Sequence, residues 1–226
     1  MVKKYVTNAH QITEEYKKIL LLAKDATVKI APSDDCSTRL VFFEKKKRPY
    51  EFFIEDGVLT VKSTKTKWYR SLRIGIDRSK IELYVPKSML EAVSIAANVG
   101  SVDVTAINCS GAIDIKINTG KINLEHVFCG RFESNGNTGS VTLGDFTAAE
   151  SVSIKRNTGA VLLNDCKAPE IFVKTNTGKV CGKLPAGTAF TVKTKTGKIE
   201  LPKAPVGEVI TAGCEIKTTT GNIKFE

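Results

Sequence analysis

Apolar and polar side chains alternate on both sides of a recurring glycine in the second half of the chain. Positions two and four residues after each glycine, and five and seven residues before it, are apolar everywhere except at Ser134 and Gly182. An alternation with a period of two predicts half-buried β-strands, and the many Val and Ile residues at these positions support that prediction. The glycines are Gly100, Gly120, Gly139, Gly159, Gly178, Gly197 and Gly221.

These glycines recur about every 20 residues, and a fixed period of this kind indicates a solenoid. One repeat cannot cover its own apolar face, but parallel stacking of equivalent strands about 4.8 Å apart buries that face continuously. We therefore predict an all-β fold, a parallel β-solenoid of about seven coils over residues 81–226. A meander of antiparallel hairpins is the alternative, and the columns of identical residue types favour the solenoid over it.

The corner of each predicted coil has its own residue types. Glycine adopts positive φ without steric cost, and asparagine tolerates turn geometry while bonding nearby backbone. We therefore interpret the repeated Asn-Thr-Gly as a corner, and we expect its asparagines to stack as an amide ladder. The ladder residues are Asn98, Asn118, Asn137, Asn157 and Asn176.

Residues 1–80 lack the repeat. The segments 37–44, 48–63 and 68–76 read as strands, and Asp56-Gly57 reads as a hairpin turn. Residues 13–24 are ambiguous, because their apolar spacing also suits a short helix. We expect a short helical or irregular start followed by strands, and a β-rich cap at residues 1–80 that is continuous with the repeats and protects their open edge.

Together, the repeat and the segments before it resemble a bacterial family of putative adhesins, a domain of unknown function numbered 4097. The resemblance covers roughly residues 19–226, and it is carried by "VKIAPSDD" (28–35), by residues 81–104, and by the serial "NTGKINL", "NTGSVTL", "NTGAVLL" and "NTGKV". It implies a solenoid and an association with the cell envelope, and it supplies no catalytic residues. The strand at residues 18–23 is likewise implied by the resemblance.

The composition narrows the function without assigning it. Lysine and arginine exceed aspartate and glutamate by 34 to 24, a net charge of +10, which suits either an anionic partner or a well-solvated surface. The six cysteines include no C-x-x-C pair and there are only two histidines, so we expect no zinc site and no cofactor. No secretory signal or spanning apolar run is visible, so we expect a cytoplasmic chain, with envelope association if the native chain has an anchor.

An outward column of lysines is the first candidate site. It lies four residues before the glycines and comprises Lys116, Lys155, Lys174, Lys193 and Lys217. Lysines about 4.8 Å apart repel by roughly 0.9 kcal/mol per pair even in water, so such a row suggests a polyanionic ligand. The alternative is a solubility device, because lysine is common on exposed β-surfaces. We expect no aromatic residues to interleave with the column, which disfavours nucleic-acid binding by base stacking.

A second candidate lies six residues after the glycines, where His126, Asp145 and Asp165 fall in successive coils. Stacked carboxylates beside a histidine suit acid–base catalysis on a sugar polymer, whereas Asp at a bend also has a purely local explanation. Cys109 and Cys129 are predicted neighbours, and the absence of an export signal favours free thiols over a disulfide.

The leading hypothesis is a non-enzymatic scaffold or interaction surface that binds a protein or an anionic polymer. A carbohydrate-active enzyme using His126, Asp145 and Asp165 is one alternative, and a polyanion binder using the lysines is another. No sequence-specific nucleic-acid motif, P-loop, dinucleotide fingerprint or nucleophile elbow is present.

Overall fold

The computed structural model describes residues 5–35, 37–46, 48–64, 79–202 and 209–226, and these residues form β-strands and turns without a helix. The N-terminal strands are β1 (Tyr5–Ile12), β2 (Lys18–Asp25), β3 (Thr27–Pro32), β4 (Thr38–Lys45), β5 (Tyr50–Glu55) and β6 (Val58–Ser63). The central strands are β7 (Lys80–Val85), β8 (Ala92–Thr105), β9 (Ala112–Thr138), β10 (Val141–Thr158) and β11 (Val161–Lys167). The C-terminal strands are β12 (Glu170–Thr177), β13 (Val180–Lys183), β14 (Thr188–Thr196), β15 (Ile199–Glu200), β16 (Ala212–Thr220) and β17 (Ile223–Phe225).

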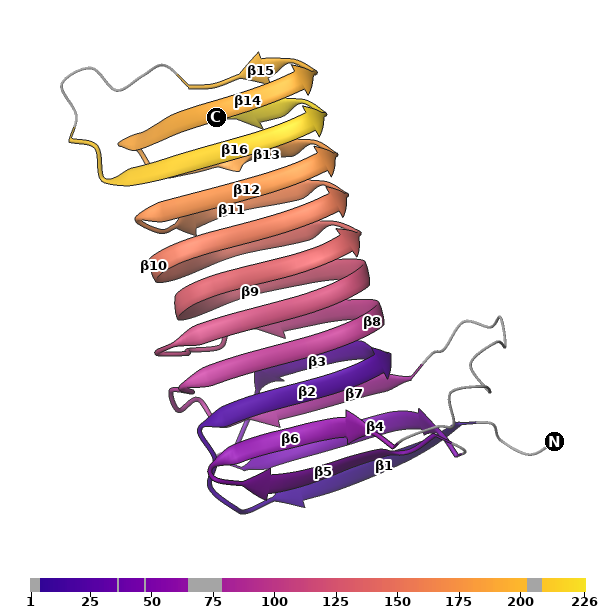
Figure 1. Cartoon of the computed structure of the whole chain (residues 1–226). Helices are drawn as coiled ribbons and strands as arrows, with labels where there is room; N and C mark the ends of the chain where they lie inside the picture. The colour runs from indigo at the N-terminus through magenta and orange to yellow at the C-terminus, as the bar shows by residue number, and fades with distance from the viewer. Residues whose placement is uncertain (1–4, 36, 47, 65–78, 203–208) are drawn as a thin grey trace.

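The strands stack into two layers that face each other across one apolar core (Figure 1). The front layer runs β5–β6–β2–β8–β9–β10–β12–β16–β14, and the back layer runs β1–β4–β7–β3–β8–β9–β10–β11–β13–β17–β15. The long strands β8, β9 and β10 bend at the corners and pass through both layers. Pairing from β6 through β2 and β8 to the C-terminal end of the front layer is parallel, so the predicted all-β solenoid-like stack is confirmed, and the antiparallel meander is wrong for the repeat.

Antiparallel pairs, β1 with β4 and β5 with β6, lie at the N-terminal end of the stack (Figure 1). Parallel pairing begins at β2 and β3, which align with β8. Residues 18–32 therefore stack with the repeats, although the sequence analysis assigned them to the cap. The division of the chain at residue 80 stays a prediction.

The helix considered for residues 13–24 does not form: residues 13–17 are irregular and residues 18–25 form β2, which confirms the irregular start and the strand at 18–23, whereas β1 at residues 5–12 was not predicted. Ile19, Leu21 and Ala23 alternate inward along β2 and are buried between the neighbouring strands β6 and β8. Pairing on both edges overrides the weaker helical spacing of this short segment. The strands predicted at residues 37–44 and 48–63 are confirmed, as is the Asp56-Gly57 turn, whereas residues 68–76 lie outside the described residues.

The recurring glycines form one corner of each coil, and their φ angles lie between 130° and 155°. An added Cβ on Gly159 would lie 2.1 Å from the carbonyl oxygen of Gly139 in the preceding coil. Glycine is therefore required in this column for two reasons: the backbone angle, and the close approach of the stacked backbones.

The asparagine ladder forms at the same corner in two segments, because no hydrogen bond between described side chains joins Asn118 to Asn137. The side-chain amide of Asn157 donates to Asn137 at 2.7 Å, and that of Asn176 donates to Asn157 at 2.7 Å. Asn118 donates to Asn98 at a longer 3.3 Å. These side chains are exposed to solvent, so the ladder runs along the outside of the corner.

The last two repeats are stacked in reverse chain order. β16 pairs with β12 on one side and with β14 on the other, and β17 lies in the same way between β13 and β15 (Figure 1). The repeat pattern implies stacking in chain order, and that order is wrong here. Lys217 is in register with both Lys174 and Lys193, so the pattern suits either order equally.

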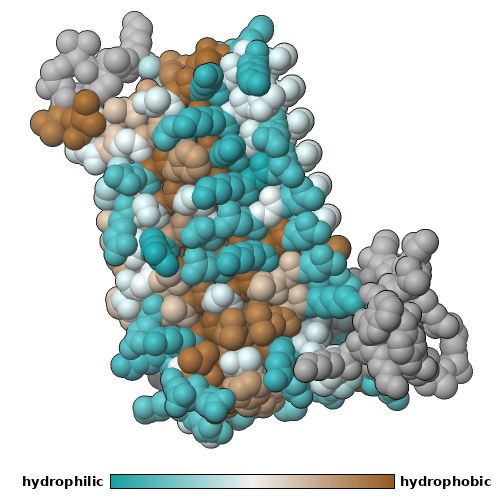
Figure 2. All heavy atoms as spheres, in the orientation of Figure 1, coloured by the Kyte–Doolittle hydropathy of each residue, from teal (hydrophilic) through white to brown (hydrophobic). Residues whose placement is uncertain are grey.

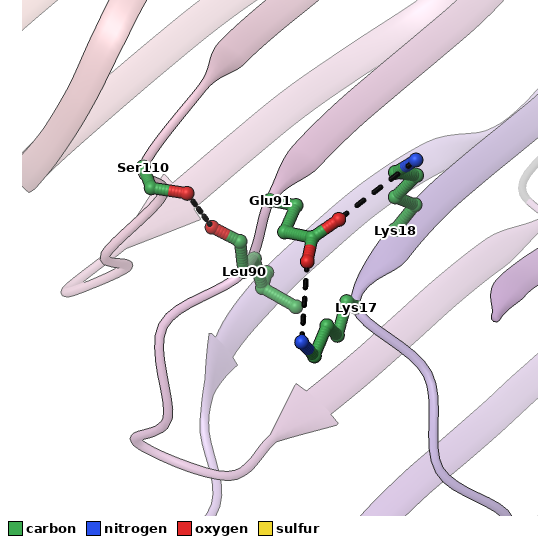
Figure 3. Close-up of polar contacts among 5 residues, drawn as sticks. All are labelled: Lys17, Lys18, Leu90, Glu91 and Ser110. Carbon is green, nitrogen blue, oxygen red and sulfur yellow. Dashed lines mark hydrogen bonds and ion pairs between the residues drawn. The ribbon is translucent and has the colours of Figure 1, made fainter.

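One ion-pair cluster joins the first parallel strand to the repeats. Glu91, just before β8, contacts the ammonium groups of Lys17 at 3.3 Å and Lys18 at 3.8 Å (Figure 3). The backbone N–H of Glu91 also donates to the carbonyl of Lys17 at 2.8 Å. Because the three side chains are largely exposed, the backbone bond positions this junction more than the charges do.

The described cysteines are all free thiols, as expected for Cys109 and Cys129, and four of them are buried. Burial raises the pKa of the Cys129, Cys166 and Cys214 thiols to about 12. They are therefore neutral core residues at physiological pH.

Candidate functional site

The predicted lysines lie on the outer surface of the front layer, exposed on β9, β10, β12, β16 and β14. Pairing aligns Lys155 with Lys174, Lys174 with Lys217, and Lys217 with Lys193. Neighbouring strands are about 4.8 Å apart, so these four residues form a continuous row of cations. We call this row, together with Lys116 on β9, the lysine column.

The order of the lysine column departs from the chain order, because β16 is inserted between β12 and β14. Asn135 interrupts it between Lys116 and Lys155, and its amide donates to Glu133 at 2.6 Å. The structure therefore brings Lys155, Lys174, Lys217 and Lys193 together, and leaves Lys116 apart from them.

The lysine column retains free charge. Lys217 contacts the carboxylate of Glu215 on the same strand, whereas the other four lysines form no ion pair with the described residues. Around Lys155 and Lys174 the outward positions two residues earlier are Ser153 and Phe172, which carry no negative charge. Lys155 and Lys174 therefore have no acidic neighbour at these positions on their own strands.

An aromatic residue lies beside the lysine column, contrary to the sequence analysis. Phe172 is half-buried on β12, and the ammonium groups of Lys155 and Lys217 lie 6.0 and 5.8 Å from its ring centre. Such cation–π contacts hold lysine side chains against the surface. In Figure 2, hydrophilic side chains cross this face with apolar surface between them. The sequence did contain a signal for this aromatic residue, because Phe172 stands in an outward position where the preceding coil has Ser153.

His126, Asp145 and Asp165 occupy equivalent bends with φ of 55°, 42° and 52°, and Ala106 has φ of 52° at the bend before them. This left-handed conformation favours Asp, Asn and His among residues with a side chain, which explains their repetition.

The structure brings only two of these three side chains together. His126 Nδ1 lies 2.8 Å from Asp145 Oδ2, with the side chains 60% and 59% exposed. Asp165 is also exposed, and it makes no hydrogen bond or ion pair with other described residues. Because both side chains are mostly exposed, the geometry of the pair is that of a surface contact at a bend. Among the described residues, no group of three His, Cys, Asp or Glu side chains could hold a metal ion.

The chain is thus an all-β protein of stacked parallel strands with a row of exposed lysines on its front layer. The chain belongs to the Toastrack DUF4097 family, whose model matches residues 16–226. This confirms the family that the repeat and residues 28–35 predicted.

Solved structures similar to the chain include a putative cell adhesion protein from Clostridium sporogenes ATCC 15579, with 10% identity, TM-score 0.45, and coverage of 98% of this chain and 99% of that one. A putative adhesin from Bacteroides fragilis NCTC 9343 has 16% identity, TM-score 0.47 and coverage of 99% and 98%. Another from Parabacteroides distasonis ATCC 8503 has 13% identity, TM-score 0.45 and coverage of 99% and 97%. No curated protein sequence matches the chain. The described part of the chain contains no helix of the length and apolarity needed to cross a bilayer.

Proposed function

We propose that this protein is a non-enzymatic interaction module that binds an extended anionic polymer along the lysine column. One observation carries the proposal: Lys155, Lys174, Lys217 and Lys193 stand in register on four consecutive strands, and only Lys217 has an acidic partner among the described residues. A linear polyanion can contact several of these charges at once, whereas a compact ligand contacts one or two.

The electrostatics support a polymer over a small ligand. Each neighbouring lysine pair costs about 0.9 kcal/mol of repulsion in water before salt screening. A polyanion removes this repulsion at several positions and releases its own condensed counterions. The Phe172 ring restrains two of the ammonium groups, which lowers the entropy lost on binding. Acidic polysaccharides and envelope polymers of the teichoic type have the required charge, and a place at the cell envelope would supply them.

The test uses a variant with Lys155, Lys174 and Lys193 all changed to Gln, measured by retention on immobilised heparin and by the salt dependence of heparin affinity. We expect elution at lower salt, and a slope of log K against log [salt] that is smaller by about two to three, because each lost contact releases about one counterion fewer.

A matched control changes the same number of exposed lysines elsewhere. Lys80 and Lys183 lie on the back-layer strands β7 and β13, and Lys167 ends β11. The control variant, with Lys80, Lys167 and Lys183 changed to Gln, has the same net charge, so it should retain more heparin affinity. Equal losses in the two variants would mean that net charge alone drives binding, and the lysine column would then be rejected as a site.

A further inference from the structure

A buried arginine departs from the apolar repeat. Arg156 on β10 is only 4% exposed, and its guanidinium donates from Nη1 to the carbonyl of Ile117 at 3.1 Å and from Nη2 to Ser134 Oγ at 2.7 Å. Gly136 makes room for it, because an added Cβ there would lie 1.7 Å from Nη1. No carboxylate pairs with Arg156 among the described residues.

The guanidinium retains its charge. Burial lowers the pKa of Arg156 to about 10, so the side chain is still protonated at neutral pH. An ionised group in the protein interior without a counter-charge carries a large desolvation penalty. Such a group requires a compensating anion, or polar partners beyond the two that it contacts.

The inward column that contains Arg156 also has unpartnered hydroxyls. Among the described residues, the buried side-chain atoms without a hydrogen-bond partner are Arg156 Nε, Thr175 Oγ1 and Thr218 Oγ1. Pairing places Arg156 beside Thr175, and Thr175 beside Thr218, on consecutive strands of the front layer. The two threonines are 1% and 6% exposed. All three unpartnered atoms therefore lie in one column of the core.

This column continues to the open end of the stack. Thr218 is in register with Thr194 on β14, the outermost strand of the front layer, and Thr194 is half-buried. From Gly136 onward the inward residues at this position are glycine, arginine and threonine, whereas earlier coils have Ala97 and Ile117. A line of polar residues thus leads from the C-terminal end of the stack to the guanidinium.

We propose that this column binds a small monovalent anion of halide size, held by Arg156 Nε–H and the hydroxyl of Thr175, with the hydroxyl of Thr218 next in the column. The donor set explains the choice. A guanidinium N–H only donates and a threonine hydroxyl can donate, while the column has no carboxylate to hold a cation. An oxyanion such as sulfate needs more donors than the unpartnered Nε–H and the neighbouring hydroxyls supply, since Nη1 and Nη2 of Arg156 each already donate one N–H to the protein. The anion would neutralise the buried charge, so it would stabilise the folded state by mass action.

The test is the melting temperature of the full chain in sodium bromide, with sodium methanesulfonate at equal ionic strength as the salt control. We expect saturable stabilisation by bromide above that of methanesulfonate. Thr175→Val keeps the shape of the side chain and removes an unpartnered hydroxyl, so this variant should fold. Its half-saturating bromide concentration should rise at least tenfold.

Thr60→Val is the matched control, because Thr60 is a buried threonine on β6, outside this column. It should respond to bromide as the wild type does. Crystals grown in bromide should show an anomalous peak within hydrogen-bonding distance of Arg156 Nε. Equal responses to the two salts, or an unchanged bromide response in Thr175→Val, would overturn the site and indicate that water alone satisfies these groups.

Discussion

A Gly159→Ala variant is expected to lose about 3 kcal/mol or more of its free energy of unfolding. Gly159 has φ of 150°, a conformation that residues with a side chain rarely adopt. Its added Cβ would also lie 2.1 Å from the carbonyl oxygen and 2.6 Å from the carbonyl carbon of Gly139. These contacts are with backbone, which cannot rotate away as a side chain can. Relief requires separating two stacked coils, and separation weakens their backbone hydrogen bonds and the core beneath them.

Urea unfolding followed by circular dichroism measures this loss, and Gly213→Ala is the matched control. Gly213 is the second residue of β16, has no positive φ, and has open space where a Cβ would be added. The control should therefore keep a near-wild-type midpoint. If the two variants had equal midpoints, close stacking of the glycine corners would not be what restricts residue 159.

The repeat allowed most of the stack to be predicted, because a two-residue alternation around a fixed turn specifies both the strands and the face that each residue occupies. Ser134 broke this pattern, and its reason lies in another coil: it accepts a hydrogen bond from Arg156 across the space left by Gly136. The three departures compensate one another. The repeat pattern considers each of these positions separately. It could not link them, because the arginine side chain brings them into contact only in the folded structure.

For the candidate sites too, the sequence predicted which residues align but not how they are arranged in the folded structure. Spacing alone predicted that the lysines align, and pairing confirms this for Lys155, Lys174, Lys217 and Lys193. Spacing could not predict their order, since β14 and β16 suit the same neighbours. The repeated bend at His126 and Asp145 was found as a pattern, but only the backbone angles show that left-handed geometry explains it.

The second large effect is a steep loss of stability at alkaline pH. Burial raises the pKa of Cys129, Cys166 and Cys214 to about 12 in the folded state, from 9.0 in the unfolded chain. Between these values the unfolded chain has released protons that the folded chain retains, so rising pH favours unfolding. The stability is complete below about pH 9, and it falls by up to about 1.4 kcal/mol per thiol for each pH unit above that.

Urea unfolding between pH 8 and 10, with a reductant present, measures this slope. We expect Cys166→Ala to remove about a third of it, and the variant with all three thiols changed to Ala to remove most of it. The titration of Arg156 does not contribute to the slope in this pH window. Its pKa in the folded state is lowered to about 10, so its release of a proton stabilises the folded state only above that pH.

Val173→Ala separates the effect of ionisation from that of lost packing. Val173 is fully buried and cannot ionise, so truncating it should lower stability at every pH and leave the slope unchanged. A thiol-free variant with the wild-type slope would assign the alkaline transition to other groups. A reduced slope would instead show that the stacked core holds its thiols neutral, because a thiolate at these positions could be solvated only if the coils came apart.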